Sequence, residues 1–115
     1  MKPKVQFRLR IHRDEDIAVG PGKIALLEAI AETGSISAAG RQLGMSYRRA
    51  WMLIDEMNRA LTSPAVSTAA GGAHGGGTQL TDTGRKLIAH YRAIESTARL
   101  AAAADIAALT RLLAP

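Results

Sequence analysis

The first residues of the chain alternate between apolar and polar positions. From Lys4 to His12, positions 5, 7, 9 and 11 are apolar, and the positions between them carry basic side chains or an amide. A period of two predicts a half-buried strand over residues 4–12 with a basic outer face. The charged residues 13–16 end this strand. Residues 20–22, Gly-Pro-Gly, then break the pattern, and Pro21 is suited to open a helix.

Three segments with helical spacing follow. The first covers residues 23–33 and ends at Gly34, and the second is short, capped by Ser35 or Ser37 and ended by Gly44. The third is capped by Ser46 and extends to about residue 61. The residues expected to face inward are Ile24, Leu27 and Ile30; then Ile36, Ala39 and Leu43; then Ala50, Ile54, Met57 and Leu61. Two amphipathic helices joined by a tight turn that contains glycine are typical of a helix-turn-helix.

The second half of the chain predicts a hairpin and a long helical region. Residues 65–70 and 78–80 flank a glycine run at 71–77, and helical spacing then continues from Thr81 into the alanine-rich tail. The predicted fold is mainly α with a small β wing. It is a winged helix-turn-helix with an N-terminal strand and long C-terminal dimerisation helices. We assign residues 1–96 to this domain and 97–115 to a helical tail that extends it for dimerisation.

Composition narrows the class of protein. A chain of 115 residues is long enough for a single hydrophobic core, and the absence of cysteine excludes disulfide scaffolds, thiolate zinc sites and cysteine nucleophiles. No secretory signal and no apolar run of membrane-spanning length is visible in the sequence. We therefore expect a cytoplasmic protein. The formal charge of +5 permits an anionic partner without identifying one.

The start of the third helix carries the strongest candidates for function. In a helix-turn-helix, the N-terminal part of the second helix of the motif enters the major groove of DNA. The candidates are Ser46, Tyr47, Arg48, Arg49 and Met52. An arginine can present two donors to guanine or bind a phosphate, and a tyrosine can donate to a phosphate. The alternative is that the two arginines form an ordinary solvated helix face, but the topology favours groove contacts.

A second group of residues is expected to contact the DNA backbone or to belong to the wing. It comprises Lys23, Ser35, Ser37, Arg41, His74, Arg85 and Lys86, most of them near helix starts, where unpaired N–H groups favour phosphate. Each could equally be a solvated surface residue. The glycine run is either a wing tip that approaches phosphates or a loop without a partner. It is not a nucleotide-binding loop, because no Gly-Lys-Ser/Thr follows it.

The stretch GSISAAGRQLGMSYRRAWMLIDEMN, at residues 34–58, resembles the N-terminal DNA-binding domain of the ModE-type molybdate-responsive transcriptional regulators, which are akin to LysR-type domains. The glycine-rich wing followed by Leu80-Thr81 and Gly84-Arg85 is similar too, and the resemblance covers roughly the first hundred residues. Full-length members add oxyanion-binding domains marked by a Ser-Ala-Arg-Asn stretch, which this sequence lacks. The resemblance therefore implies DNA binding, but no molybdate or other cofactor held by this chain. The uncharged first wing strand, AVSTAA, implies weaker wing contacts.

Nothing in the sequence assembles an active site or a metal site. His12, His74 and His90 lie in three separate elements, and the acidic residues 14–16 lack the spacing of a calcium loop. We therefore expect a sequence-specific regulator that binds double-stranded DNA as a homodimer and not an enzyme; no separate sensor can be identified. The predicted dimerisation residues are Ile88, Tyr91, Leu100, Ile106, Leu109 and Leu113. The alternative is a winged-helix protein-interaction module that does not bind DNA specifically.

Overall fold

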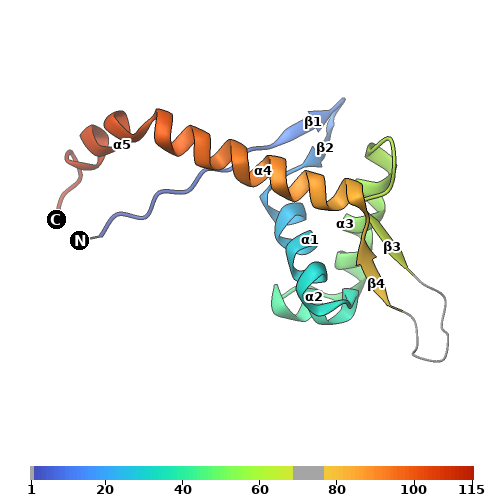
Figure 1. Ribbon diagram of the computed structural model, residues 1–115. Coiled ribbons are helices and arrows are strands. Elements are labelled where there is room, and N and C mark those ends of the chain that lie inside the picture. Colours follow the sequence, from blue (N-terminus) through green and yellow to red (C-terminus); the bar gives the residue numbers. More distant parts are fainter. Residues whose placement is uncertain (1, 69–76) are drawn as a thin grey trace.

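The computed structural model describes residues 2–68 and 77–115, and it shows a helical body from which one long helix projects (Figure 1). The elements follow in the order β1 (Ile11–Arg13), β2 (Asp16–Val19), α1 (Pro21–Thr33), α2 (Ile36–Gln42), α3 (Tyr47–Ala60), β3 (Val66–Thr68), β4 (Thr78–Leu80), α4 (Asp82–Ala101) and α5 (Ala103–Thr110). The molecule measures 58 × 30 × 23 Å and has a radius of gyration of 17.0 Å. A compact domain of this length would have a radius of about 13 Å, so the chain is markedly elongated.

Helix α1 forms the centre of the body. It packs against α2, α3, α4 and β4, and its side chains Leu26, Leu27 and Ile30 are fully buried. Pro21 opens the helix, and Gly34 ends it in the left-handed conformation at φ 68°, with its N–H donating to the carbonyl of Ile30. This geometry favours glycine, because a Cβ is strained at positive φ. The prediction of a helix ended by Gly34 is confirmed.

Helices α2 and α3 form the helix-turn-helix. The Ser35 hydroxyl accepts the N–H of Ala38, so Ser35 and not Ser37 caps α2, and the Ser46 hydroxyl caps α3 by accepting the N–H of Arg49. Both caps satisfy N–H groups that a helix start otherwise leaves unpaired. The expectation that Leu43 faces inward is wrong: α2 ends at Gln42, and Leu43 in the turn is 37% exposed.

The wing is an antiparallel pair of short strands, with Val66 opposite Leu80 in β3 and β4. Asn58, near the end of α3, holds the base of the wing in place. The Asn58 Oδ1 accepts the N–H of Ala65, and the Asn58 Nδ2 donates to the carbonyl of Val66. These bonds fix where the chain turns from α3 into the wing. The predicted hairpin is confirmed for its described residues, whereas most of the glycine run, with His74, lies outside them.

The predicted strand at residues 4–12 is wrong in extent. Only Ile11–Arg13 is a strand, paired with β2 through a turn in which Asp14 has φ 55°, and residues 2–10 have no regular secondary structure. The reason is that residues 2–10, which we call the arm, run beside helix α4 and not beside another strand (Figure 1). The alternation itself is confirmed only as far as residue 10, because Ile11, expected on the covered side, is 49% exposed. The side chains of Val5, Phe7 and Leu9 are half-buried, and the intervening ones are exposed.

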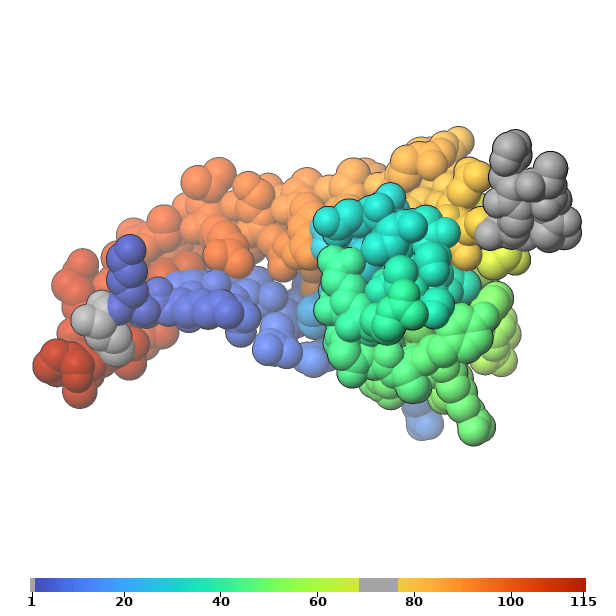
Figure 2. Space-filling model, turned by 90° about the horizontal axis from the view of Figure 1, so that it is seen from below, coloured from blue at the N-terminus to red at the C-terminus, as the bar shows by residue number. Residues whose placement is uncertain are grey.

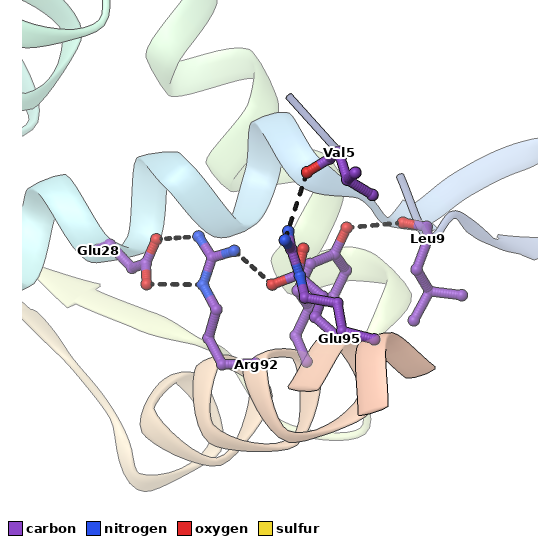
Figure 3. Close-up of polar contacts among 7 residues, drawn as sticks. Val5, Leu9, Glu28, Arg92 and Glu95 are labelled. Atoms are coloured by element: carbon purple, nitrogen blue, oxygen red, sulfur yellow. Dashed lines mark hydrogen bonds and ion pairs between the residues drawn. The ribbon is translucent and has the colours of Figure 1, made fainter. Parts of the chain in front are cut away.

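The long helix α4 is fixed to the body and to the arm by polar contacts (Figure 3). Arg92 binds both carboxylate oxygens of Glu28 on α1 and, one turn along its own helix, the carboxylate of Glu95 at 2.6 Å. These two carboxylates raise the pKa of Arg92. A two-point contact of this kind constrains direction as well as distance, so it sets the angle of α4 to α1.

Tyr91 lies inside this junction and not on a dimer surface, which corrects the prediction made for it. Its side chain is only 3% exposed, and its hydroxyl donates to the carbonyl of Leu9 at 2.9 Å. Burial raises the pKa of the Tyr91 phenol. Helix α4 continues to Ala101, and α5 follows after a break at Ala102, so the tail is helical as predicted. No helix in the described ranges is both long and apolar enough to cross a membrane.

Candidate nucleic-acid interface

The outer face of α3 carries two of the five residues predicted to read DNA, and a third lies at the start of the helix. Ala50, Ile54 and Met57 point into the core, and successive residues of a helix are rotated by about 100°. Arg48 and Met52 therefore lie opposite the buried stripe. Both are exposed, with Met52 at 50%, and Ser46 at the helix start is exposed as well. This face is free to enter a groove.

The two adjacent arginines point in different directions. Arg48 lies on the outer face, whereas Arg49 lines a cleft of about 890 Å³ between α3 and the β1–β2 hairpin. Leu53 and Glu56 follow Arg49 along this side of α3, and Arg10 and Arg13 line the cleft from the arm and the hairpin. The arginine pair is therefore divided between an outward-facing position and a position at the flank of the helix.

Tyr47 stands on the third side of α3. It is 56% exposed and makes an edge-to-face contact with Trp51, with ring centroids 6.4 Å apart and planes at 83°. Trp51 is half-buried and packs against the core. An aromatic pair of this geometry limits the positions that Tyr47 can adopt, while its hydroxyl stays available to a partner.

Lys23 does not reach the surface, which corrects its assignment as a backbone contact. It is 7% exposed, its ammonium donates to the carbonyl of Ile17, and it lies 3.4 Å from the carboxylate of Glu56. The lysine thus joins β2, α1 and α3. A buried ammonium is stable in the fold only with such partners, so Lys23 is structural.

The other residues predicted to contact the DNA backbone differ in whether their side chains already bind partners within the protein. Arg85 donates to the carbonyl of Leu80 and pairs with Asp82, and this pairing lowers the pKa of Asp82. Arg41 and Ser37 are exposed on one turn of α2, with Arg41 Nη1 donating to the Ser37 hydroxyl at 3.5 Å. Lys86 is exposed in the first turn of α4. Arg41 and Lys86 therefore remain candidates, while Ser35 acts as a cap.

Comparison with known families agrees with this geometry. The profile of the family "Bacterial regulatory helix-turn-helix protein, lysR family" matches residues 22–85, more than half of the chain. The chain belongs to this LysR family. The match runs from α1 through the helix-turn-helix and the wing to the first turn of α4. The arm, the β1–β2 hairpin and most of the long helix therefore lie outside the part matched to the LysR family.

Similar proteins include regulators whose names refer to molybdenum. The molybdenum transport protein ModE of Azotobacter vinelandii is 47% identical over 92 residues, which are 78% of this chain and 34% of that protein. The molybdenum-pterin-binding protein MopB of Rhodobacter capsulatus is 53% identical over 78 residues, 68% of this chain and 29% of that one. The DNA-binding transcriptional dual regulator ModE of Escherichia coli K12 is 38% identical over 88 residues, 76% and 34%. The chain spans about a third of the length of these relatives.

A solved structure has the same fold. It is the DNA-binding domain of CbnR in complex with DNA, with a TM-score of 0.57, 22% identity, and coverage of 76% of this chain and 95% of that one. At this identity the likeness concerns the fold alone. It agrees with the winged helix-turn-helix that the sequence predicts for this LysR-family chain.

The sequence did not predict the structural roles of two residues at the base of the wing, Asn58 and Gly84. Asn58 ties α3 to the wing, and a short amide near the end of a helix and before Pro64 is the only signal in the sequence that could have suggested this. Gly84 lets the first turn of α4 approach the backbone of Ala65, where a Cβ has no room. Its place in the Leu-Thr-x-x-Gly pattern was visible, but the contact that requires glycine was not.

Proposed function

We propose that this chain is a sequence-specific DNA-binding transcriptional regulator whose helix α3 enters the major groove. The observation that carries the proposal is the exposed outer face of α3, which begins with Arg48, two residues after the Ser46 cap, in the second helix of a helix-turn-helix. An α-helix in the major groove reads sequence with side chains near its N-terminus. Because such regulators act on chromosomal DNA, we place the protein in the bacterial cytoplasm.

The side chains of α3 divide into base contacts and backbone contacts. Arg48 is placed to give two parallel donors to guanine O6 and N7, and Met52, one turn further along the same face, offers an apolar contact to a thymine methyl group. Tyr47 and Arg49, on the two flanks of the helix, suit the phosphates on either side of the groove. Arg41 and Lys86 add backbone contacts from α2 and α4.

We further propose that the protein binds DNA as a homodimer through its projecting helices. Leu100 is 78% exposed, Leu109 64% and Leu113 52%, and Leu112 is exposed beside them. Such an apolar surface is rarely left in water by a soluble chain, and a second copy offers the matching surface. Six residues were predicted for this contact. Of these, Leu100, Leu109 and Leu113 are exposed and Ile106 is half-buried, whereas Ile88 packs against the core and Tyr91 is buried. A two-fold dimer would present two α3 helices to half-sites one DNA turn apart, about 34–36 Å.

Selection from a random pool of duplexes tests the DNA-binding proposal. Duplexes retained by the protein over several rounds should converge on a motif with two related half-sites, and binding to this motif should exceed binding to random duplex by at least about 10³-fold. A pool that stays random, with equal affinity for all duplexes, would contradict sequence-specific recognition. It would favour the alternative of a protein-interaction module.

Sedimentation equilibrium tests the dimer separately. The wild type should sediment as a dimer at micromolar concentration, and Leu109→Glu should shift it toward the monomer because the carboxylate would be buried at the contact. Lys86→Glu changes the charge of the first turn of α4, at the far end of that helix from the tail, and serves as the control. A wild type that is monomeric at high micromolar concentration would contradict the dimer.

A further inference from the structure

The positive charge of the chain is concentrated in its first thirteen residues. These contain five lysines or arginines and no aspartate or glutamate, whereas the rest of the chain contains ten basic and ten acidic residues. The net charge of +5 is therefore the charge of this segment alone. The α3 face, the helix starts and the tail together add nothing to it. This distribution calls for a role of the arm itself.

The arm is held in a defined path along α4. The carbonyl of Leu9 accepts the Tyr91 hydroxyl, and the carbonyl of Val5 accepts a donor from Arg99 at 3.3 Å (Figure 3). The Arg99 guanidinium also lies over the Phe7 ring, 5.5 Å from its centroid. Because every second side chain of the arm faces α4, the others are exposed to solvent. These exposed side chains are Lys4, Gln6, Arg8 and Arg10. The result is a basic row with a fixed backbone.

This row continues to the helix that we propose reads DNA. Arg10, at the end of the arm, lines the same cleft as Arg49 of α3, and Arg13 of β1 lines it as well. The acidic groups in that cleft are Glu56, which is paired with Lys23, and residues 14–16 at the hairpin. In the view from below, the arm and the helix-turn-helix are visible on the same face of the molecule (Figure 2).

We propose that the arm is a second DNA-binding element, in which Lys4, Arg8 and Arg10 contact phosphates of the duplex beyond the segment read by α3. The inference rests on the proposed function and extends it. Each strand of the duplex carries one phosphate per 3.4 Å or so of helix axis, and outward side chains of an extended chain repeat every 6–7 Å, so the exposed basic side chains of the arm can each meet a phosphate. The contacts to Tyr91 and Arg99 order the arm before it binds DNA. The arm therefore loses less conformational entropy on binding than a disordered tail would lose.

The salt dependence of DNA binding measures these contacts. Each phosphate neutralised contributes about 0.9 to the slope of log K against log salt concentration. The triple variant Lys4→Gln, Arg8→Gln, Arg10→Gln should therefore lower the slope by about 2.7 and weaken binding up to about 100-fold at 0.15 M salt. Its preference for the selected motif over random duplex should stay within a few-fold of wild type, because phosphates carry no sequence information.

A matched pair of single variants distinguishes direct phosphate contacts of the arm from the effect of the protein's overall positive charge. Arg8→Gln and Arg111→Gln each remove one exposed charge, the first from the arm and the second from the far end of the tail. Arg8→Gln should lower the slope by about 0.9, and Arg111→Gln should leave it unchanged. Equal effects of the two variants, or a triple variant with the wild-type slope, would overturn the inference.

Two further outcomes are distinguishable in the same experiment. A triple variant that keeps the slope but sediments as a monomer would show that the arm binds a second copy of the chain and not DNA, which overturns the inference. A wild type that binds no duplex at low salt would overturn the proposed function together with the inference. A wild type that binds, with a slope that the triple variant retains, would overturn only the role of the arm.

Discussion

Replacing Gly84 by alanine tests how α4 is seated on the wing. An ideal Cβ built on Gly84 would approach the carbonyl oxygen of Ala65 well inside 3.0 Å, the carbonyl carbon at 3.2 Å and the Leu80 Cβ at 3.4 Å. The obstacle is backbone that cannot rotate away. The Ala65 carbonyl also accepts the N–H of Thr81, whose hydroxyl donates to the carbonyl of Pro64, so this backbone is held from both sides.

Helix propensity and packing act in opposite directions at this position. Alanine is favoured over glycine within a helix by up to about 1 kcal/mol. An added carbon in a closed contact costs typically 1–3 kcal/mol, and the backbone obstacle places Gly84 at the upper end of that range. We therefore expect Gly84→Ala to lower the free energy of unfolding by about 2 kcal/mol, which would lower the melting temperature by roughly 8 °C for a domain of this size.

Gly22→Ala is the matched control, because Gly22 lies in the first turn of α1 and a Cβ there would meet nothing within 4 Å. It should be neutral or slightly stabilising. Urea unfolding followed by circular dichroism, at equal protein concentration, measures both variants. A Gly84→Ala protein as stable as Gly22→Ala would refute the close approach of α4 to the wing base.

Two further stability predictions follow from single contacts. Ser46→Ala should lower the free energy of unfolding by about 1 kcal/mol, because the N–H of Arg49 loses its cap, whereas Ser37→Ala should be nearly silent; equal urea midpoints for the two would contradict the assignment of the cap. Tyr91→Phe should cost about 1–2 kcal/mol, because the carbonyl of Leu9 loses its donor. Since burial raises the Tyr91 pKa, the folded state holds this proton more tightly than the unfolded state, so wild-type stability should fall as pH rises above about 10. The Phe variant should lack this component of the decline, and identical alkaline profiles would contradict it.

Local signals in the sequence predicted most of the body. Periodicity placed α1, α2 and α3, and Gly34, Ser35 and Ser46 marked helix ends because each acts through its own backbone neighbourhood. The arm shows where such reasoning ends. A period of two indicates which side chains of an extended segment are buried. It does not indicate whether a sheet or a helix buries them. The partner of the arm, α4, lies more than eighty residues away along the chain.

The candidate site shows the same division. The exposed start of α3 followed from the topology, but the inward turn of Lys23 depended on the carbonyl of Ile17 and on Glu56, which no local pattern brings together. Tyr91 fitted an apolar helix stripe, and only the path of the arm reveals that it is buried. The concentration of the net charge in the first thirteen residues is present in the sequence, but the role that we propose for it depends on the arm being held along α4.

The most direct test of the account is the affinity of wild type and Arg48→Ala for the selected duplex and for a scrambled duplex at one fixed salt concentration. If Arg48 reads a base from the outer face of α3, the variant should lose about 1–3 kcal/mol on the selected duplex and much less on the scrambled one, so the ratio of the two dissociation constants should collapse. An equal loss on both duplexes, or none on either, would contradict sequence reading by α3.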